Sequence, residues 1–394
     1  MSLEEPRPAV ERLVAMLPTV STEHVDLAEA GGRVLAEGIV ADRPSPSADV
    51  TAMDGYAVAT ADTPGELPVS AEASIGRAPP ALDRGTAVRV FTGAPIPPGA
   101  DAVVKREDVV EKSASNVVDG PIDVGRHIRY EGENLAAGEE VVAGGVEIET
   151  TVAAALATFG VDRPKVFRRV GVGTIATGDE VLAPSDQPTP WQLRDSNTSA
   201  ITVAAGSNRW VELVAAERRV DNKELLTKSL TAMLEQCDVV FLSGGVSMGN
   251  YDFVPEVISG IGGEIVFHRL RQRPGKPLLG ALGPQGQAII GLPGNPVSVM
   301  VTAHRWGSMV LRKLAGFSAV APPVPSVLLA DDDGATIDLW WHRLVTIDGD
   351  GLAHLVPSRG SGDLVSAARS SGFIVVPPQL GGQGPWPYYG WTAS

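Results

Sequence analysis

The chain has 394 residues, more than the roughly 250 to 300 at which one hydrophobic core stops growing, so several domains are expected. A formal charge of −15 disfavours binding to nucleic acid or to an anionic membrane surface. The lone cysteine, Cys237, excludes an internal disulfide framework, and neither a signal peptide nor an apolar run of about 18 residues is evident. These features predict a cytoplasmic globular protein.

The N-terminal segment, residues 1–22, is predicted to contain one amphipathic helix. Four apolar residues from Val10 to Leu17 recur at the i, i+3, i+4, i+7 spacing of a helix with one apolar face, and Pro18 follows. Such a helix needs an apolar partner surface elsewhere in the chain.

The next region, from about Asp42 to Val146, consists of short β-rich runs separated by turn segments, which predicts an all-β lobe. Thr151–Gly160 then has the composition of a short alanine-rich helix that ends on its glycine. Pro164 follows as a boundary signal, so a new domain is expected to begin near Lys165.

Between Lys165 and Phe317, apolar strands alternate with helical stretches, which predicts βα units around a mainly parallel sheet. One helix places five apolar residues between Leu226 and Cys237 on a single stripe, as expected for a helix that covers a sheet. After Val320 a proline-rich linker leads into strand patterns without a long helical pattern. This last segment is predicted to be a small β domain.

Ligands of doubly wound sheets bind beyond the carboxyl ends of the strands, so the loops at that edge are the candidate site. Four loops are unusual: Thr177–Glu180, Ser243–Asp252, Arg273–Pro277 and Leu292–Ser298. All but the third directly follow an apolar strand. A single glycine turn is better explained by structure alone, and a helix cap is explained equally well that way, but three such loops in one sheet favour a phosphate site.

Hydrogen-bond donors and carboxylates recur at the same edge. The second loop offers glycines and serine hydroxyls, and Asn295 is placed to cap a helix that begins with Pro296. The carboxylates suit Mg²⁺, although each alone is more often a helix cap or a solvated charge. They are Asp179, Glu180, Asp195, Asp221 and Asp252. Of these five carboxylates, Asp195 is the one best explained as a helix cap.

A basic segment, His268–Lys276, stands against this acidic background. Strand alternation would point Arg269, Arg271 and Arg273 to one side, where a solvated face explains part of the cluster. Lys276, between a glycine and a proline, is the better ligand candidate.

Gly171, Gly173 and Ala176 imitate a dinucleotide-binding fingerprint, but the glycines fall within the predicted strand and prolines interrupt the following segment. We therefore predict no dinucleotide site. His268, His304 and Cys237 lack metal-ligand spacing and are assigned no chemistry.

Taken together, these segments resemble the molybdopterin molybdenumtransferases, the MoeA and gephyrin E-domain family. The resemblance spans nearly the whole chain. Besides the four loops and the RDSN segment Arg194–Asn197, it rests on Ser47–Val58, Phe91–Asp108 and Ile128–Glu139. The chain departs from the usual family residues at Asn134, at Arg273 and at Ser370–Ser371.

The resemblance implies a multidomain α/β plus β architecture. Within an N-terminal region 1–164, residues 1–22 form a helix that packs on the βα domain. Residues 23–45 and 125–164 form a mixed α+β domain, and residues 46–124 form an inserted β lobe. Residues 165–318 are the molybdopterin-binding, doubly wound βα domain, and residues 319–394 are the small C-terminal β domain.

The resemblance also implies an activity: insertion of molybdate into adenylylated molybdopterin, with release of AMP, in a Mg²⁺-dependent step. Asp221 and Asp252 would hold Mg²⁺. The residues implied in catalysis are Asp54, Thr92, Glu180, Asp221, Asp252, Arg273 and Lys276. Those implied in binding are Gly178, Asp179, Asp195, Ser196, Asn197, Ser243, Gly244, Gly245, Ser247, Gly275, Lys276, Pro293, Gly294, Asn295, Ser298, Arg343 and Ser361. Among them, Lys276, Arg343 and Ser361 would face molybdate.

The family implies a homodimer, in which a partner's lobe would bring Asp54 and Thr92 to the site. Transient contacts with the adenylyltransferase and with molybdoenzymes are also expected. Two alternatives stay open: a carrier or scaffold that binds the pterin without turnover, and a molybdopterin adenylyltransferase, whose related domain shares several of these loops.

Overall fold

The computed structural model describes residues 3–246 and 253–391. Two predicted site residues, Ser247 and Asp252, lie outside the described residues. The chain divides into two compact units. The first comprises Met1–Glu37, Gly144–Ala153 and Asp162–Ser394, and the second comprises Gly38–Ala143 and Ala154–Val161. No helix in the described part of the chain is long and apolar enough to cross a membrane.

The first unit is built on a six-stranded sheet with the order β16-β13-β17-β21-β20-β18. The strands are β13 (Val170–Thr177), β16 (Val211–Arg219), β17 (Val239–Ser243), β18 (Glu264–His268), β20 (Leu279–Leu282) and β21 (Ala288–Leu292). The first four in the order are parallel, and β20 is antiparallel to both of its neighbours. It follows that β18 runs in the direction of the four parallel strands, so five carboxyl ends share one edge.

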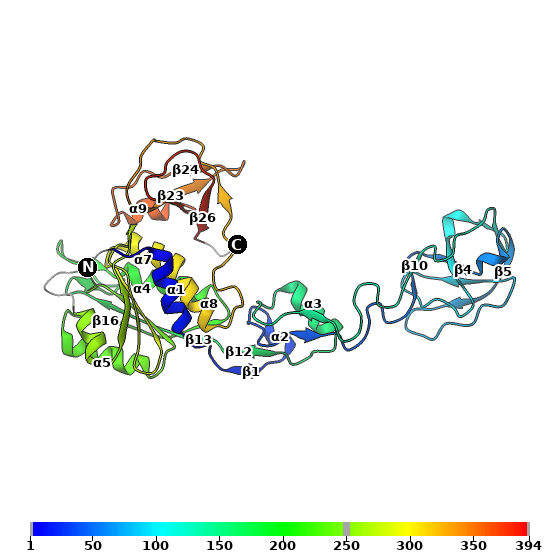
Figure 1. Cartoon of the computed structure of the whole chain (residues 1–394), viewed down its shortest axis with the longest axis horizontal. Helices are drawn as coiled ribbons and strands as arrows, with labels where there is room; N and C mark the ends of the chain where they lie inside the picture. Colours follow the sequence, from blue (N-terminus) through cyan, green and yellow to red (C-terminus); the bar gives the residue numbers. More distant parts are fainter. Residues whose placement is uncertain (1–2, 247–252, 392–394) are drawn as a thin grey trace. The chain divides into compact units, whose positions relative to one another are not determined.

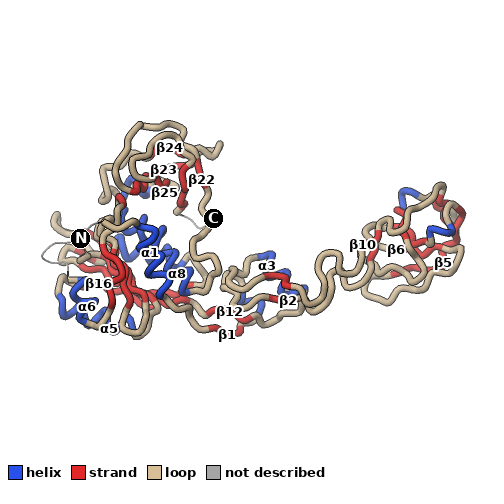
Figure 2. The backbone as a smooth tube through the Cα atoms, in the orientation of Figure 1, coloured by secondary structure: helices blue, strands red, loops and turns tan. Residues whose placement is uncertain are grey.

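Helices cover both faces of this sheet, as the tube in Figure 2 shows around β16. The helices are α1 (Pro6–Met16), α4 (Ser196–Gly206), α5 (Lys223–Leu234), α6 (Val254–Gly260), α7 (Pro296–Thr302) and α8 (Ser308–Leu314), with a π-helical turn, η3 (Ala303–Gly307), between the last two. One buried cluster joins α1, α4, α7 and α8 to the sheet, and a second joins α5 and α6. The α/β prediction for this region is therefore correct.

The predicted N-terminal helix is confirmed as α1, whose Val10, Leu13 and Val14 are buried. These side chains belong to the cluster formed with α8 and the sheet. Gly171 and Gly173 lie within a strand, as predicted, and every residue of β13 is buried. A Cβ on Gly173 would lie 2.4 Å from the Met233 sulfur, so this glycine allows close packing of α5.

The rest of the first unit that precedes the βα region is small. It comprises β1 (Thr22–His24), α2 (Leu27–Ala30), the start of α3 (Thr150–Thr158), and β12 (Lys165–Phe167). Strand β1 pairs antiparallel with β12. Two short strands, β14 (Val181–Leu182) and β15 (Leu193–Arg194), pair within the βα region.

The second unit has a six-stranded sheet of order β7-β4-β6-β5-β9-β8. The strands are β4 (Gly55–Val58), β5 (Gly65–Ala73), β6 (Ala87–Val90), β7 (Ala102–Lys105), β8 (Val110–Glu111) and β9 (Ser115–Val118), with 3₁₀ turns η1 (Thr60–Asp62) and η2 (Arg106–Asp108). The shorter strands β2 (Ile39–Val40), β3 (Val50–Thr51), β10 (Ile128–Arg129) and β11 (Glu140–Val142) form two further pairs. The predicted all-β lobe is thus observed.

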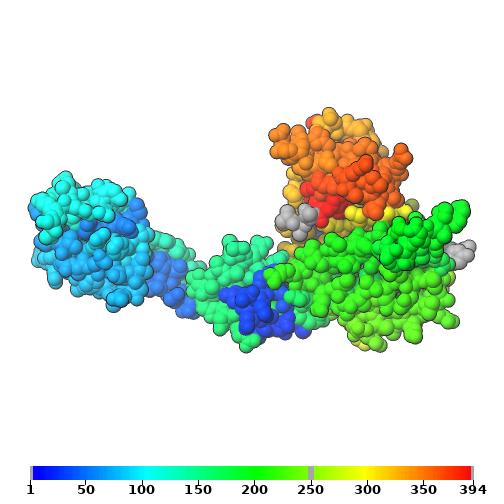
Figure 3. Space-filling view, turned by 180° about the vertical axis from the view of Figure 1, so that it is seen from behind, coloured from blue at the N-terminus to red at the C-terminus, as the bar shows by residue number. Residues whose placement is uncertain are grey.

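The C-terminal segment forms a second sheet in the first unit, of order β19-β23-β25-β26-β22, with β24 beside β23. Its elements are β19 (Gln272–Arg273), β22 (Ser326–Val327), β23 (Trp340–Ile347), β24 (Ala353–Leu355), α9 (Leu364–Ala368), β25 (Gly372–Val376) and β26 (Trp386–Gly390). Figure 1 shows these elements beside α7, and Figure 3 shows their orange-to-red surface against the green and yellow βα region. Strand β19 comes from the βα region, so the two sheets are linked through the chain that carries Arg273. The predicted domain boundaries themselves stay predictions.

Candidate functional site

Three of the four predicted loops leave the carboxyl ends of adjacent parallel strands, β13, β17 and β21. They approach one another closely: a Cβ on Gly294 would lie 3.8 Å from Cα of Gly244. Gly244 itself has φ of +95°, and a Cβ there would lie 2.5 Å from the Thr177 carbonyl oxygen. Only glycine fits this position, which brings the backbone of the β17 loop against the end of β13.

Asn197 binds two of these loops at once. Its Nδ2 donates to Ser243 Oγ at 2.7 Å and to the Gly294 carbonyl oxygen at 2.8 Å. Its Oδ1 is buried and has no hydrogen-bond partner among the residues that the structure describes. Asn197 therefore fixes the mutual position of the loops after β17 and β21.

Asp195 acts as a helix cap. Its Oδ1 accepts a hydrogen bond from the Thr198 N–H at 2.9 Å, at the start of α4. Its side chain is 1% exposed, and Arg218 Nη1 lies 3.6 Å from Oδ2. These contacts agree with the predicted capping role of Asp195. They fix the N-terminus of α4, where Ser196 and Asn197 lie.

Of the other described carboxylates, Asp221 lines a narrow crevice together with Thr177 and Gly245. The Asp221 N–H donates to Asp179 Oδ1 at 3.1 Å, which joins the segment after β16 to the Gly178–Asp179 turn. Asp179 and Glu180 are exposed. Thr177 Oγ1 is buried and has no hydrogen-bond partner in the described part of the chain.

This arrangement fits a Mg²⁺ ion, which usually takes only one or two protein carboxylates together with phosphate and water oxygens. No group of three or more histidine, cysteine or acidic residues suited to a metal occurs within residues 3–246 and 253–391. Asp221 would supply one hard oxygen ligand at the sheet edge, and Asp252, the second predicted ligand, lies outside the described residues.

The loop after β21 leads directly into α7. Pro296 is the first helical residue, as predicted, but the Asn295 side chain makes no capping hydrogen bond. Instead, the Val297 N–H donates to the Ser361 carbonyl oxygen at 3.0 Å. Ser361 therefore lies at this loop, with its backbone as the observed contact. Gly294 and Asn295 are exposed, whereas Pro293 and Ser298 are buried.

The fourth loop connects β18 to β20 and so leaves the same sheet edge. Gly275 has φ of +92°, and the Leu270 N–H donates to the Lys276 carbonyl oxygen at 2.8 Å. The side chains of Arg273 and Lys276 are exposed.

The expected strand alternation of the three arginines in this segment is wrong. Strand β18 ends at His268, and Arg269 has φ of +71°, so the alternation is interrupted. Arg271 forms ion pairs with Glu5 and with Asp338. These pairs explain its position without a ligand.

Arg343 is already paired. Its Nη1 donates to Asp333 Oδ1 at 3.0 Å, and its guanidinium lies 4.2 Å from the centre of the Trp341 ring. The side chain is only 10% exposed. An oxyanion at Arg343 would have to compete with Asp333.

Asp54 and Thr92 lie in the second unit, where the structure brings them together. The Thr92 backbone N–H and hydroxyl both donate to Asp54 Oδ1, each at 2.7 Å. These hydrogen bonds hold the pKa of Asp54 below its usual value. Both residues are exposed.

Two residues near the loops were not predicted from the sequence. His268, at the end of β18, lies with Nε2 2.9 Å from the Val246 carbonyl oxygen, so it contacts the β17 loop. Gln272 is fully buried beneath the fourth loop. A buried polar residue within a basic run is not recognisable from spacing, because its burial depends on the C-terminal sheet.

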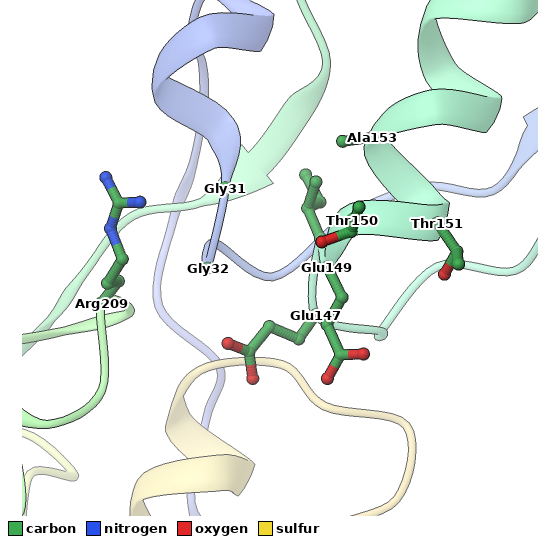
Figure 4. A pocket seen from close by; sticks show the side chains of 9 residues that line it. Gly31, Gly32, Glu147, Glu149, Thr150, Thr151, Ala153 and Arg209 are labelled. Carbon is green, nitrogen blue, oxygen red and sulfur yellow. The ribbon is translucent and has the colours of Figure 1, made fainter.

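A separate hollow of about 520 Å³ lies beside α2 and the start of α3. Figure 4 shows Arg209, Glu147 and Glu149 around it, next to Gly31 and Gly32. Burial, with a smaller effect of Glu149, raises the pKa of Glu147. None of the predicted site residues lines this hollow.

Two family models match the chain. Residues 1–160 match the MoeA N-terminal region (domain I and II), and residues 173–313 match a probable molybdopterin binding domain. A molybdopterin molybdenumtransferase of Nostoc sp. is 34% identical over 372 residues, which cover 90% of this chain and 85% of the relative.

The chain belongs to the molybdopterin molybdenumtransferase family. A second relative of that name, from Staphylococcus epidermidis, is 30% identical over 96% of this chain and 93% of its own length. The crystal structure of a molybdopterin biosynthesis MoeA protein from Pyrococcus horikoshii OT3 is similar with a TM-score of 0.84 and 26% identity, over 98% of this chain and all of that one. The family resemblance inferred from the sequence is confirmed.

Proposed function

We propose that this protein is a molybdopterin molybdenumtransferase that inserts molybdate into adenylylated molybdopterin and releases AMP. The observation that carries the proposal is the convergence of the loops after β13, β17 and β21, tied by the Asn197 amide. Glycines and helix N-termini at such an edge expose backbone N–H groups that suit the phosphates of a nucleotide. The reaction is assigned to the cytoplasm, in keeping with the single cysteine.

The nucleotide end of the substrate would lie along these loops. The turns at Gly178, Gly244, Gly245 and Gly294 would present backbone N–H groups to the phosphate oxygens, and Ser243 is held in place by Asn197. Asp179 and Glu180 would contact sugar or pterin donor groups. For cleavage of a phosphate bond, we expect the protein to act mainly by positioning the substrate and by electrostatic stabilisation of the transition state, rather than by covalent catalysis.

Mg²⁺ would be held by Asp221 and Asp252 and would neutralise charge on the phosphates as the bond to AMP breaks. The Asp221 backbone N–H donates to Asp179, which holds the segment that carries this carboxylate beside the β13 loop. Molybdate would lie near the fourth loop, where Lys276 supplies a point charge and Arg273 a second cation. Arg343 and Ser361 would assist from the C-terminal sheet, Arg343 only on release from Asp333.

We infer that the active form is a homodimer. In this proposal the exposed Asp54–Thr92 pair reaches the site of the partner subunit, where the carboxylate, kept ionised by Thr92, would bind a cationic or hydrogen-bond-donating group. Transient partners would be the enzyme that supplies the adenylylated pterin and the apoenzymes that accept the product.

Reconstitution tests the proposal. Purified protein is incubated with adenylylated molybdopterin, Mg²⁺ and molybdate, and both AMP and molybdenum cofactor are measured. The proposal predicts that both products form. Bound pterin without AMP release would instead support a carrier, and consumption of ATP with free molybdopterin would support an adenylyltransferase.

A further inference from the structure

Beneath the fourth loop lies a buried polar pair, Gln272 and Trp306. Gln272 is 0% exposed and Trp306 is 4% exposed. Gln272 Nε2 donates to the Gly275 carbonyl oxygen at 3.0 Å, and its Oε1 accepts from Trp306 Nε1 at 2.9 Å. Because the indole can only donate and the carbonyl can only accept, the amide has a single orientation that satisfies both. A buried amide that lost these partners would be left with unsatisfied polar atoms, which destabilises the fold.

The hydrogen-bonded carbonyl belongs to the peptide plane that begins Lys276. This plane is rigid, so holding the Gly275 oxygen also fixes the direction of the Lys276 N–Cα bond. Gly275 is confined on another side, because a Cβ there would lie 2.3 Å from Thr302 Cγ2. The loop backbone therefore has little freedom at the residue that precedes the lysine.

A second buried group holds the other end of the loop. His342 Nδ1 donates to the Arg273 carbonyl oxygen at 3.2 Å, and its Nε2 accepts from Arg305 Nη1 at 2.7 Å. The backbone of both cationic loop residues, Arg273 and Lys276, is thus anchored from below while their side chains are exposed.

We propose that Gln272, oriented by Trp306, is a positioning residue for molybdate binding that acts through Lys276. This inference rests on the proposed function, in which Lys276 holds the oxyanion. The lysine side chain is flexible, so its charge is held at one position only if its backbone is fixed. Loss of the Gln272 hydrogen bonds should therefore weaken the binding of molybdate without affecting the nucleotide loops.

Gln272→Met keeps the length of the side chain and removes both hydrogen bonds. It should raise the KM for molybdate about tenfold and leave the KM for adenylylated molybdopterin within about twofold, since small displacements of a binding group have effects of this size or larger. The matched control is Gln287→Met, in the same unit. Gln287 is partly buried and donates to the Leu234 carbonyl oxygen at 2.9 Å, and its variant should change neither constant.

Trp306→Phe provides a milder second variant, which removes one N–H and retains the ring. It should raise the molybdate KM less than Gln272→Met does, in a protein that still melts cooperatively. If Gln272→Met does not fold, the test rests on Trp306→Phe. An unchanged KM for molybdate in Trp306→Phe would then overturn the inference.

The double variant Lys276→Ala with Gln272→Met separates the inference from the proposed function. If Gln272 acts through Lys276, the double variant should bind molybdate no more weakly than Lys276→Ala alone. Additive losses would overturn the inference and leave the proposed function intact. An unchanged molybdate KM in Lys276→Ala alone would overturn the proposed role of the lysine itself.

Discussion

Asn197 illustrates what residue types and spacing can predict at the scale of single residues. The sequence identified it as a site residue from its place in the RDSN segment, but its observed contacts are with Ser243 and the Gly294 backbone. Asp195, in contrast, is the helix cap that its place before Ser196 and Asn197 predicted. Which atom of a side chain faces a ligand and which holds the backbone depends on packing between distant segments, and this cannot be read from local spacing.

The Asp221→Asn substitution tests the proposed metal ligand. Asparagine retains the backbone N–H that donates to Asp179 but removes a charged oxygen from a hard cation. AMP release at low Mg²⁺ should fall by about 10²-fold or more, with partial recovery at high Mg²⁺ and an unchanged melting temperature. The same is predicted for Asp252→Asn. Asp350→Asn, at an exposed turn, serves as the control, and wild-type turnover of Asp221→Asn at low Mg²⁺ would disprove the assignment.

His342 should make the protein sensitive to mild acid. Burial, with the nearby Arg305 cation, lowers the pKa of His342 well below 6.5. As the pH falls below 6.5, the unfolded chain binds a proton on this histidine and the folded chain does not. The free energy of unfolding should therefore be highest above pH 6.5 and decrease as the pH drops below that value.

His342→Gln should flatten the decline of melting temperature between pH 6.5 and about 5.5, although His304, whose pKa burial also lowers, will contribute part of the slope. Exposed His24 gives the matched control, His24→Gln, which should retain the wild-type slope. An equal slope in His342→Gln would show that His342 does not control this acid sensitivity.

At the scale of elements, the alternation of strands and helices predicted the parallel sheet and hence the convergence of three loops at one edge. It did not predict β19. Gln272–Arg273 pairs with Trp340–Trp341 of β23, a pairing between segments far apart in sequence. Two residues have no pattern of their own, so their partner strand could not be recognised before folding.

Gly244→Ala tests whether the β17 loop needs its close approach to β13. The methyl group would lie 2.5 Å from the Thr177 carbonyl oxygen. Affinity for adenylylated molybdopterin should fall at least about tenfold, because the loop must move. Gly286→Ala is the matched control: its φ is +86°, close to the +95° of Gly244, but no atom lies within 4 Å of its Cβ. Equal affinity losses in both variants would indicate backbone strain rather than the contact.

At the scale of the whole molecule, composition and order of motifs predicted the family, which the relatives confirm. The assembly remains a prediction. Sedimentation should give twice the chain mass of 41.1 kDa. Asp54→Asn should lower turnover without changing this mass, because Asp54 is proposed to act in the partner's site and not in association. A monomer with full activity at low concentration would contradict the shared site.

The most direct test of the proposed reaction is the stoichiometry of its products. In a single turnover with saturating Mg²⁺, AMP and molybdenum cofactor should appear together, in equal amounts, and both should depend on molybdate with the same midpoint. Cofactor formed without AMP, or AMP released with no molybdenum incorporated at any molybdate concentration, would contradict the account.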